Sequence, residues 1–116
     1  SDDETSMFLK EYNLPEPGLH KLIHAGFRLL ELETFFTGGP IEVRAWTIKQ
    51  GTRALKAAGE IHTDFQRGFI KAEVFKYDDL IRLGSEKAVK DTGLAKLQGR
   101  DYVVQNGDCI YFHFNV

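Results

Sequence analysis

The stretch EVRAWTIKQGTRALKAAGEIHTDFQRGFIKAEV, residues 42–74, predicts a strand, a helix and a second strand in direct succession. Side chains of opposite character alternate along the first strand, as expected where one face of a sheet is buried. The two alternating sets are Val43, Ala45 and Thr47, and Arg44, Trp46 and Ile48. Gly51 ends this strand, and Thr52 is the expected N-cap of the helix that follows.

The predicted helix covers residues 53–62, with Leu55 or Ala54, Ala58 and Ile61 directed inward. Gly59 weakens helix formation, so a short helix is expected. Residues 69–77 alternate again and predict the second strand. Its two sets are Ile70, Ala72 and Val74, and Phe69, Lys71, Glu73 and Phe75.

The flanking residues add further elements to this unit. An apolar stripe predicts a helix over residues 15–32, and aromatic residues before the turn at 38–40 predict a strand. Asp78 or Asp79 is the expected cap of a helix that breaks at residues 84–86 and restarts towards Val89. The C-terminal expectations are a strand at residues 102–104, a type I′ turn at Asn106-Gly107, and a strand over residues 109–116 with Ile110, Phe112, Phe114 and Val116 on one face.

The resulting order is helix, then β-β-α-β-α-β-β, which indicates an α+β fold in which a mixed sheet packs on a helix. A chain of 116 residues with 42% hydrophobic residues suits one compact domain with an attached element. Its single cysteine, Cys109, excludes an internal disulfide, and we expect a cytoplasmic protein with an inert thiol. The sequence contains neither a membrane-length apolar run nor a recognisable signal peptide.

Charge is unevenly distributed along the chain. The net charge is −2, but residues 42–76 hold seven basic and four acidic side chains. This segment therefore favours an anionic partner, although surfaces of mixed sign are common.

The segment AAGEIHTDFQRGF, residues 57–69, places His62, Thr63 and Asp64 together at a predicted helix end. A base with its orienting carboxylate would need a nucleophile, and a metal site would need more ligands. A structural turn is the simplest interpretation, with Asp64 as a cap, Gly68 as a bend, and Phe65 and Phe69 as anchors on the core. Contact of this polar tip with a polar ligand is compatible with it.

A second candidate site is an open face of the sheet. If the helix covers one face, we expect Trp46 and Lys71 on the other, where aromatic and cationic side chains can stack on unpaired bases. The full expected set is Arg44, Trp46, Ile48, Phe69, Lys71, Glu73, Phe75, Tyr111 and His113. Burial of this face by protein is the alternative. The i, i+4 pair His20 and His24 offers only two ligands and does not make a metal site.

Four stretches closely resemble the C-terminal part of YchF-type proteins, which are Obg-related P-loop ATPases and GTPases. The resemblance covers about residues 15–116 and rests on GLHKLIHAGFRLLELETFFTGGP, EVRAWTIKQGT, AAGEIHTDFQRGFIKAEV and GRDYVVQNGDCIYFHFNV. It implies a TGS domain, a ubiquitin-like β-grasp, over residues 34–116, and assigns residues 1–33 to the helical end of the parent NTPase domain or a linker. Leu55 stands where the family commonly has a proline near the start of the helix.

The resemblance also implies a parent protein that binds ATP or GTP with Mg²⁺ and associates with ribosomes. The present sequence has no GxxxxGK[ST] loop, so we expect neither nucleotide binding nor hydrolysis from it, and no cofactor. The expected partners are the ribosome or structured RNA such as tRNA, and the parent NTPase domain in cis, without a membrane. A structural lid that regulates the parent NTPase domain is the alternative role. The predicted contact residues are Arg44, Trp46, Lys49, Lys56, His62, Thr63, Arg67 and Lys71.

Overall fold

The computed structural model describes residues 25–26, 29–38 and 43–115, and internal contacts divide the chain into two units, residues 1–32 and 33–116. In the first unit, the Leu30 amide donates to the Gly26 carbonyl at 3.1 Å, as in a helix. The remainder of the helix predicted for residues 15–32, including His20 and His24, lies outside the described residues.

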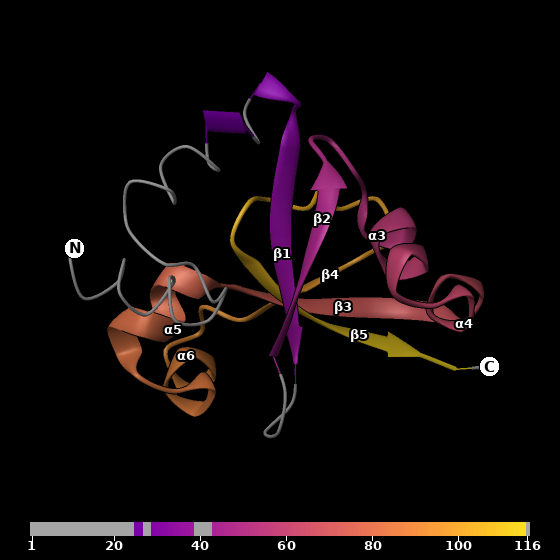
Figure 1. The fold of residues 1–116 in the computed structure, drawn as a ribbon. Helices are drawn as coiled ribbons and strands as arrows, with labels where there is room; N and C mark the ends of the chain where they lie inside the picture. Colours follow the sequence, from indigo (N-terminus) through magenta and orange to yellow (C-terminus); the bar gives the residue numbers. More distant parts are fainter. Residues whose placement is uncertain (1–24, 27–28, 39–42, 116) are drawn as a thin grey trace. The chain divides into compact units, whose positions relative to one another are not determined.

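The second unit alternates strands with short helices, labelled as in Figure 1. Five strands and four helices follow one another in the described residues. They are β1 (Leu32–Gly38), β2 (Val43–Lys49), α3 (Ala54–Ile61), α4 (Thr63–Arg67), β3 (Phe69–Lys76), α5 (Tyr77–Leu83), α6 (Glu86–Asp91), β4 (Lys96–Gln98) and β5 (Asp108–Phe114). The predicted order is confirmed in outline: α4 is an additional helix after α3, α5 and α6 are the two parts of the helix that was predicted to break, and the short β4 precedes β5 in place of the strand expected at residues 102–104.

The strands form one mixed sheet in the order β2-β1-β5-β3-β4. The first and last strands, β1 and β5, lie side by side and parallel, with Phe36 beside Cys109. Antiparallel pairing joins β5 to β3 and β3 to β4. A mixed sheet with β1 and β5 at its centre and α3 packed on one face is the α+β, β-grasp architecture that the resemblance implied.

The core lies between α3 and one face of this sheet. Ala54, Ala57 and Ala58 of α3 are all fully buried, and their small side chains let the helix backbone approach the strands closely. Phe35 of β1 and Phe112 of β5 lie beneath them, with ring centroids 6.3 Å apart in an edge-to-face arrangement. The inward direction predicted for Ala54 and Ala58 is therefore confirmed.

The short helix α4 closes one end of this core. Phe65 packs against the core cluster, and its ring centroid lies 4.2 Å from that of Phe114. A β-carbon at Gly59 of α3 would lie 2.2 Å from the Gln66 side-chain oxygen of α4. The glycine that weakens α3 therefore permits the close packing of the two helices.

Helices α5 and α6 lie at the opposite end of the β3–β5 pair from α3 and α4 (Figure 1). Lys90 of α6 reaches Glu73 of β3 at 3.4 Å, and Val89 is fully buried. Since Glu73 points away from the α3 core, α6 covers part of the second face of the sheet. Gly84, with a φ of 88°, ends α5, and the Ser85 hydroxyl accepts the Ala88 amide at 3.1 Å. The predicted break and restart is confirmed.

The expected helix caps are wrong in both cases. Thr52 does not cap α3, because its hydroxyl donates to the Lys49 carbonyl at 2.6 Å and Arg53 occupies the N-cap position. The N-cap of α5 is Lys76, and Asp78 and Asp79 lie in the first turn. In that position they still complement the positive end of the helix dipole.

Two strand predictions and one turn prediction also need correction. The pairing of β3 with β5 shifts register between Phe69 and Lys71, so Phe69 enters the core and Ile70 is 57% exposed. The strand expected at residues 102–104 is reduced to a single bridge between Arg53 and Val103. Glu31 is the one non-glycine residue with positive φ in the described ranges, so Asn106-Gly107 is a turn but not of type I′.

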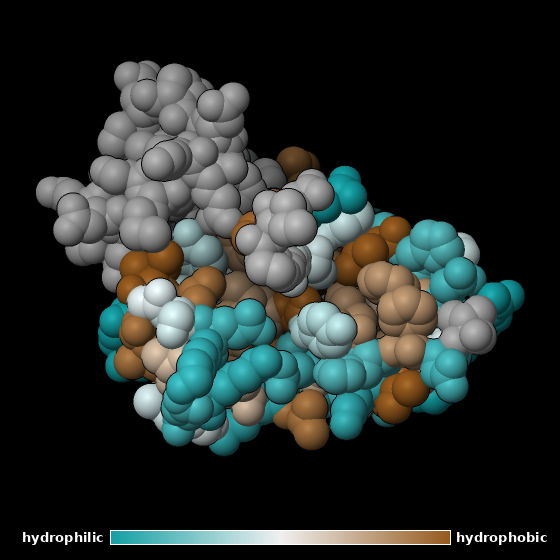
Figure 2. Space-filling view, turned by 90° about the horizontal axis from the view of Figure 1, so that it is seen from below, coloured by the Kyte–Doolittle hydropathy of each residue, from teal (hydrophilic) through white to brown (hydrophobic). Residues whose placement is uncertain are grey.

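Exposed hydrophobic residues are spread over several strands, and Figure 2 shows separate brown patches among hydrophilic side chains on the face it displays. Large side chains more than half exposed in the second unit are Val43, Ile70, Leu97 and Tyr111. Across the described ranges, no helix combines the length and apolar character required to cross a bilayer.

Candidate contact surface

His62 links the two helices that cover the core. Its backbone amide donates to the Ala58 carbonyl at the end of α3, and its Nδ1 accepts the Asp64 amide at 3.0 Å at the start of α4. The predicted cap at Asp64 is therefore wrong, because His62 performs that role. While Nδ1 accepts this hydrogen bond, the proton of the neutral ring resides on Nε2. The side chain is 57% exposed and available to a partner.

The other polar residues of this tip are exposed, but one is already paired. Thr63 begins α4 with an exposed side chain, and Arg67 donates to the Asp64 carboxylate at 3.0 Å. The charge of Arg67 is therefore partly compensated within the chain. Phe65 and Phe69 anchor the segment on the core as predicted. Among the described residues, no group of three or more His, Cys, Asp or Glu side chains is arranged to hold a metal.

We expect His62→Ala to lower the free energy of unfolding by about 0.5–2 kcal/mol, because the Asp64 amide loses its acceptor. His62→Asn should retain most of the stability, since an asparagine oxygen can accept the same bond. Urea denaturation of both variants measures the difference. Equal losses would contradict a capping role and point to the ring contact with Phe65, whose centroid lies 6.2 Å away.

Trp46 faces the core rather than an open sheet surface. Its indole Nε1 donates to the Thr37 hydroxyl at 2.7 Å, and its ring packs against the core cluster together with Ile48. Arg44 lies over this ring, with its Cζ 4.7 Å from the centroid. The predicted platform that joined Trp46 to Lys71 on one outward face is therefore wrong.

Lys71 lies on the other face of the sheet. It pairs with His113 across β3 and β5, and the rings of His113 and Tyr111 are 4.8 Å apart. Tyr111 is 56% exposed, whereas Phe75 and Cys109 further along the same face are buried. Part of the predicted aromatic and cationic surface thus exists, without Arg44 or Trp46.

Lys49 and Lys56 flank the start of α3, and both are exposed. The fold brings two further exposed cations to the same place. Arg53 is the N-cap residue of α3, and the Arg100 carbonyl accepts the Leu55 amide at 3.1 Å. The sequence prediction omitted both, and for Arg100 no local signal existed, because its position depends on contacts between distant segments.

The start of α3 does not fit the phosphates of a nucleotide cofactor. Such sites use free amides at a helix N-terminus. Here the Ala54 amide donates to the Tyr102 carbonyl at 2.7 Å, and the Leu55 amide is also occupied. The turn that precedes α3 therefore does not offer the Ala54 and Leu55 amides to a triphosphate.

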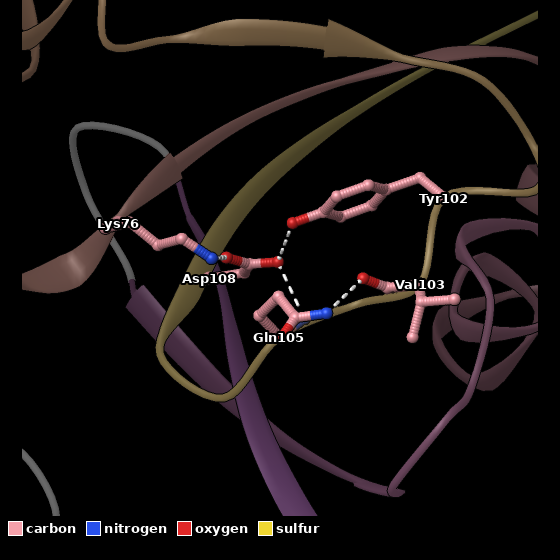
Figure 3. A network of polar contacts seen from close by, with 5 residues as sticks. All are labelled: Lys76, Tyr102, Val103, Gln105 and Asp108. Atoms are coloured by element: carbon pink, nitrogen blue, oxygen red, sulfur yellow. Dashed lines mark hydrogen bonds and ion pairs between the residues drawn. The ribbon is translucent and has the colours of Figure 1, made fainter.

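Asp108 is the one buried charged residue in the described chain, and its network is structural (Figure 3). Its carboxylate accepts from Lys76 Nζ at 2.5 Å, the Tyr102 hydroxyl at 2.6 Å and the Gln105 amide at 2.8 Å. Burial raises the pKa of Tyr102, and the hydrogen bond to Asp108 raises it further. Burial and the negative charge of Asp108 likewise raise the pKa of Glu33, against the opposing effect of Lys76. This network joins the loop before β5 to the end of β3.

Comparison with known proteins identifies relatives over nearly the full chain. The family model YchF-GTPase_C, described as "Protein of unknown function (DUF933)", matches residues 32–115. The chain is 52% identical over 115 residues to "Ribosome-binding ATPase YchF" of Haemophilus ducreyi and 56% identical to human "Obg-like ATPase 1". These matches cover 99% of this chain but only 32% and 29% of the two relatives.

A solved structure agrees with the sequence matches. The YchF GTPase of Schizosaccharomyces pombe superposes with a TM-score of 0.76 at 37% identity, over 97% of this chain and 30% of that protein. The chain thus corresponds to less than a third of the length of each of these proteins.

Proposed function

Because this chain belongs to the YchF-GTPase_C family, we propose that it is a non-catalytic binding module through which a longer nucleotide-hydrolysing protein contacts the ribosome. The ribosome is proposed as the partner because the Haemophilus ducreyi relative is named a ribosome-binding ATPase. ATP or GTP with Mg²⁺ would be bound by the parts of the parent protein that this chain does not span. The proposed place of action is the cytoplasm.

One observation supports this assignment most directly. Exposed polar and cationic side chains are carried by α3, α4 and their flanks: Lys49 and Lys56 lie at the start of α3, and His62 lies where α3 joins α4. A surface of this sign suits ribosomal RNA, whose phosphate backbone dominates the affinity of most nucleic-acid-binding proteins. The predicted contacts at Thr63 and Arg67 lie at the start and end of α4 on this side, whereas Lys71 lies on the opposite face of the sheet and would make a separate contact. Arg44 and Trp46 are secondary candidates, because their ring stacking and core packing already engage them.

Co-sedimentation of the full chain with purified ribosomes tests the proposal. We expect saturable binding at 50 mM salt that weakens about 20- to 40-fold at 200 mM, as for about three phosphate contacts. An acidic protein of similar size serves as the control for trapping in the pellet. Failure of the chain to sediment at 50 mM salt would contradict a ribosome-binding role.

A regulatory lid on the parent NTPase domain is the second candidate. It is favoured by the exposed side chains of Val43, Leu97 and Tyr111 on the face opposite α3, which another domain of the parent protein would cover. In this case, deletion of the region from the parent would change ATP turnover while ribosome association stays intact. The ribosome-binding proposal requires the reverse result.

A further inference from the structure

We propose that four cations at the start of α3 form a binding site for the phosphate backbone of RNA. The site, here called the α3 basic cluster, consists of Lys49, Arg53, Lys56 and Arg100. The inference rests on the proposed ribosome-binding function and assigns the chemistry of one contact within it.

The cluster is assembled from two segments that are far apart in the sequence. The Ala54 and Leu55 amides donate to the carbonyls of residues 102 and 100, at 2.7 and 3.1 Å. The Val104 amide returns a bond to the Thr52 carbonyl at 2.9 Å. These bonds hold the loop that carries Arg100 against the segment that carries the other three cations.

Pairing distinguishes this cluster from the cations of the helices α4, α5 and α6. Among the described residues, none of the four forms an ion pair with a carboxylate. By contrast, every cation of α4, α5 and α6 is paired: Arg67 with Asp64, Arg82 with Asp79, Lys87 with Asp91, and Lys90 with Glu73 and Glu86. Uncompensated cations attract an external anion more strongly than paired ones, so the α3 basic cluster is a stronger candidate than the cations of α4, α5 and α6.

One member of the cluster is held in place before any partner arrives. The guanidinium of Arg53 donates through Nη1 to the Asp101 carbonyl at 2.8 Å. This bond uses one of its five N–H donors and leaves the rest for a phosphate, whose oxygens match the guanidinium fork. The Arg53 side chain is therefore already partly ordered in the folded chain, so binding a phosphate loses less side-chain entropy.

The surroundings favour a phosphate backbone over an acidic peptide. The apolar residues of the adjoining helix turn inward, and Ala54, Ala57 and Ala58 are fully buried. A peptide would therefore find few apolar side chains to anchor it, whereas backbone phosphates need only cations.

Two double variants of equal charge change test the site in the full chain. Lys56→Glu with Arg100→Glu alters the cluster, and Arg82→Glu with Lys87→Glu alters paired cations on α5 and α6. The probe is a fluorescein-labelled ribosomal RNA hairpin, followed by anisotropy over a salt series. We expect a 10- to 100-fold loss of affinity and a salt slope smaller by about two for the cluster variant, and a change below about threefold for the control.

Each other outcome would overturn a different claim. Equal losses in the two variants would show a general charge effect and refute the site. Lost ribosome binding with unchanged hairpin affinity would assign the cluster to a protein and refute the RNA contact. If the unaltered chain binds neither RNA nor ribosomes, the proposed function fails with the inference. Lys56→Gln with Arg100→Gln provides a milder second variant, and circular dichroism verifies that all variants fold.

Discussion

Replacement of Phe112 by alanine is expected to lower the free energy of unfolding by about 3–5 kcal/mol, the largest loss from any single aromatic in this core. Phe112 is 6% exposed and lies in the middle of β5. Its ring meets three others, from β1, α4 and β3, with centroids 6.3, 6.5 and 6.2 Å away. The substitution removes contacts with both the sheet and the helices, so no single element can move to fill the space.

Phe114 supplies the matched control for this substitution. It lies two residues further along the same strand, and it is 41% exposed although its ring contacts Phe65. We expect Phe114→Ala to lower the free energy of unfolding by no more than about half as much as Phe112→Ala, because much of the Phe114 side chain is already exposed to water. Urea unfolding of both variants measures the difference. Comparable losses would contradict the central position assigned to Phe112.

The strands and helices were largely predictable because their signals are local. Alternation identified β2, β3 and β5, and Gly84 with Ser85 marked the boundary between α5 and α6. The short strand β4 was missed, since its three residues gain their strand conformation from pairing with β3. The N-cap predicted for α3 was wrong for a related reason, because the amides at the start of α3 donate to carbonyls of a loop more than 40 residues away.

Alternation could not determine which side of each strand faces the core. It separated Trp46 and Ile48 from the other set of β2, but both sets contain apolar residues. The set with the larger apolar side chains, Trp46 and Ile48, buries more apolar area, which explains why it faces the core. The wrong prediction that Trp46 and Lys71 share a face came from comparing β2 and β3 without knowing their register. That register depends on pairing through the intervening strands β1 and β5.

The candidate site was predictable only in part, for the same physical reason. The basic character of residues 42–76 indicated Lys49 and Lys56, and the polar tip indicated His62 and Thr63. The pairing of Arg67 with Asp64 and the approach of Arg100 appear only when the chain is folded. The α3 basic cluster is also distinct from the core, because its four cations are exposed whereas Phe35, Phe69 and Phe112 are buried. Variants of the α3 basic cluster should therefore change binding with little effect on unfolding.

Replacement of Asp108 by alanine is expected to lower the free energy of unfolding by about 2–4 kcal/mol. The carboxylate is fully buried and accepts hydrogen bonds from Lys76, Tyr102 and Gln105. Its removal leaves the Tyr102 hydroxyl and the Gln105 amide without an acceptor inside the protein. The Lys76 ammonium group can be hydrated after the substitution, since its side chain is 46% exposed. The decrease in the free energy of unfolding should therefore be smaller than when one partner of a fully buried ion pair is removed.

Asp108→Asn separates the charge of this carboxylate from its hydrogen bonds. The amide oxygen can accept one or two of the three bonds, but the attraction to Lys76 is lost, so an intermediate loss is expected. Asp101→Ala, at an exposed position in the same loop, should change stability by less than about 0.5 kcal/mol. Denaturation by urea at neutral pH gives all three values. If Asp108→Ala were as stable as Asp101→Ala, the network in Figure 3 would not be what fastens this loop to β3.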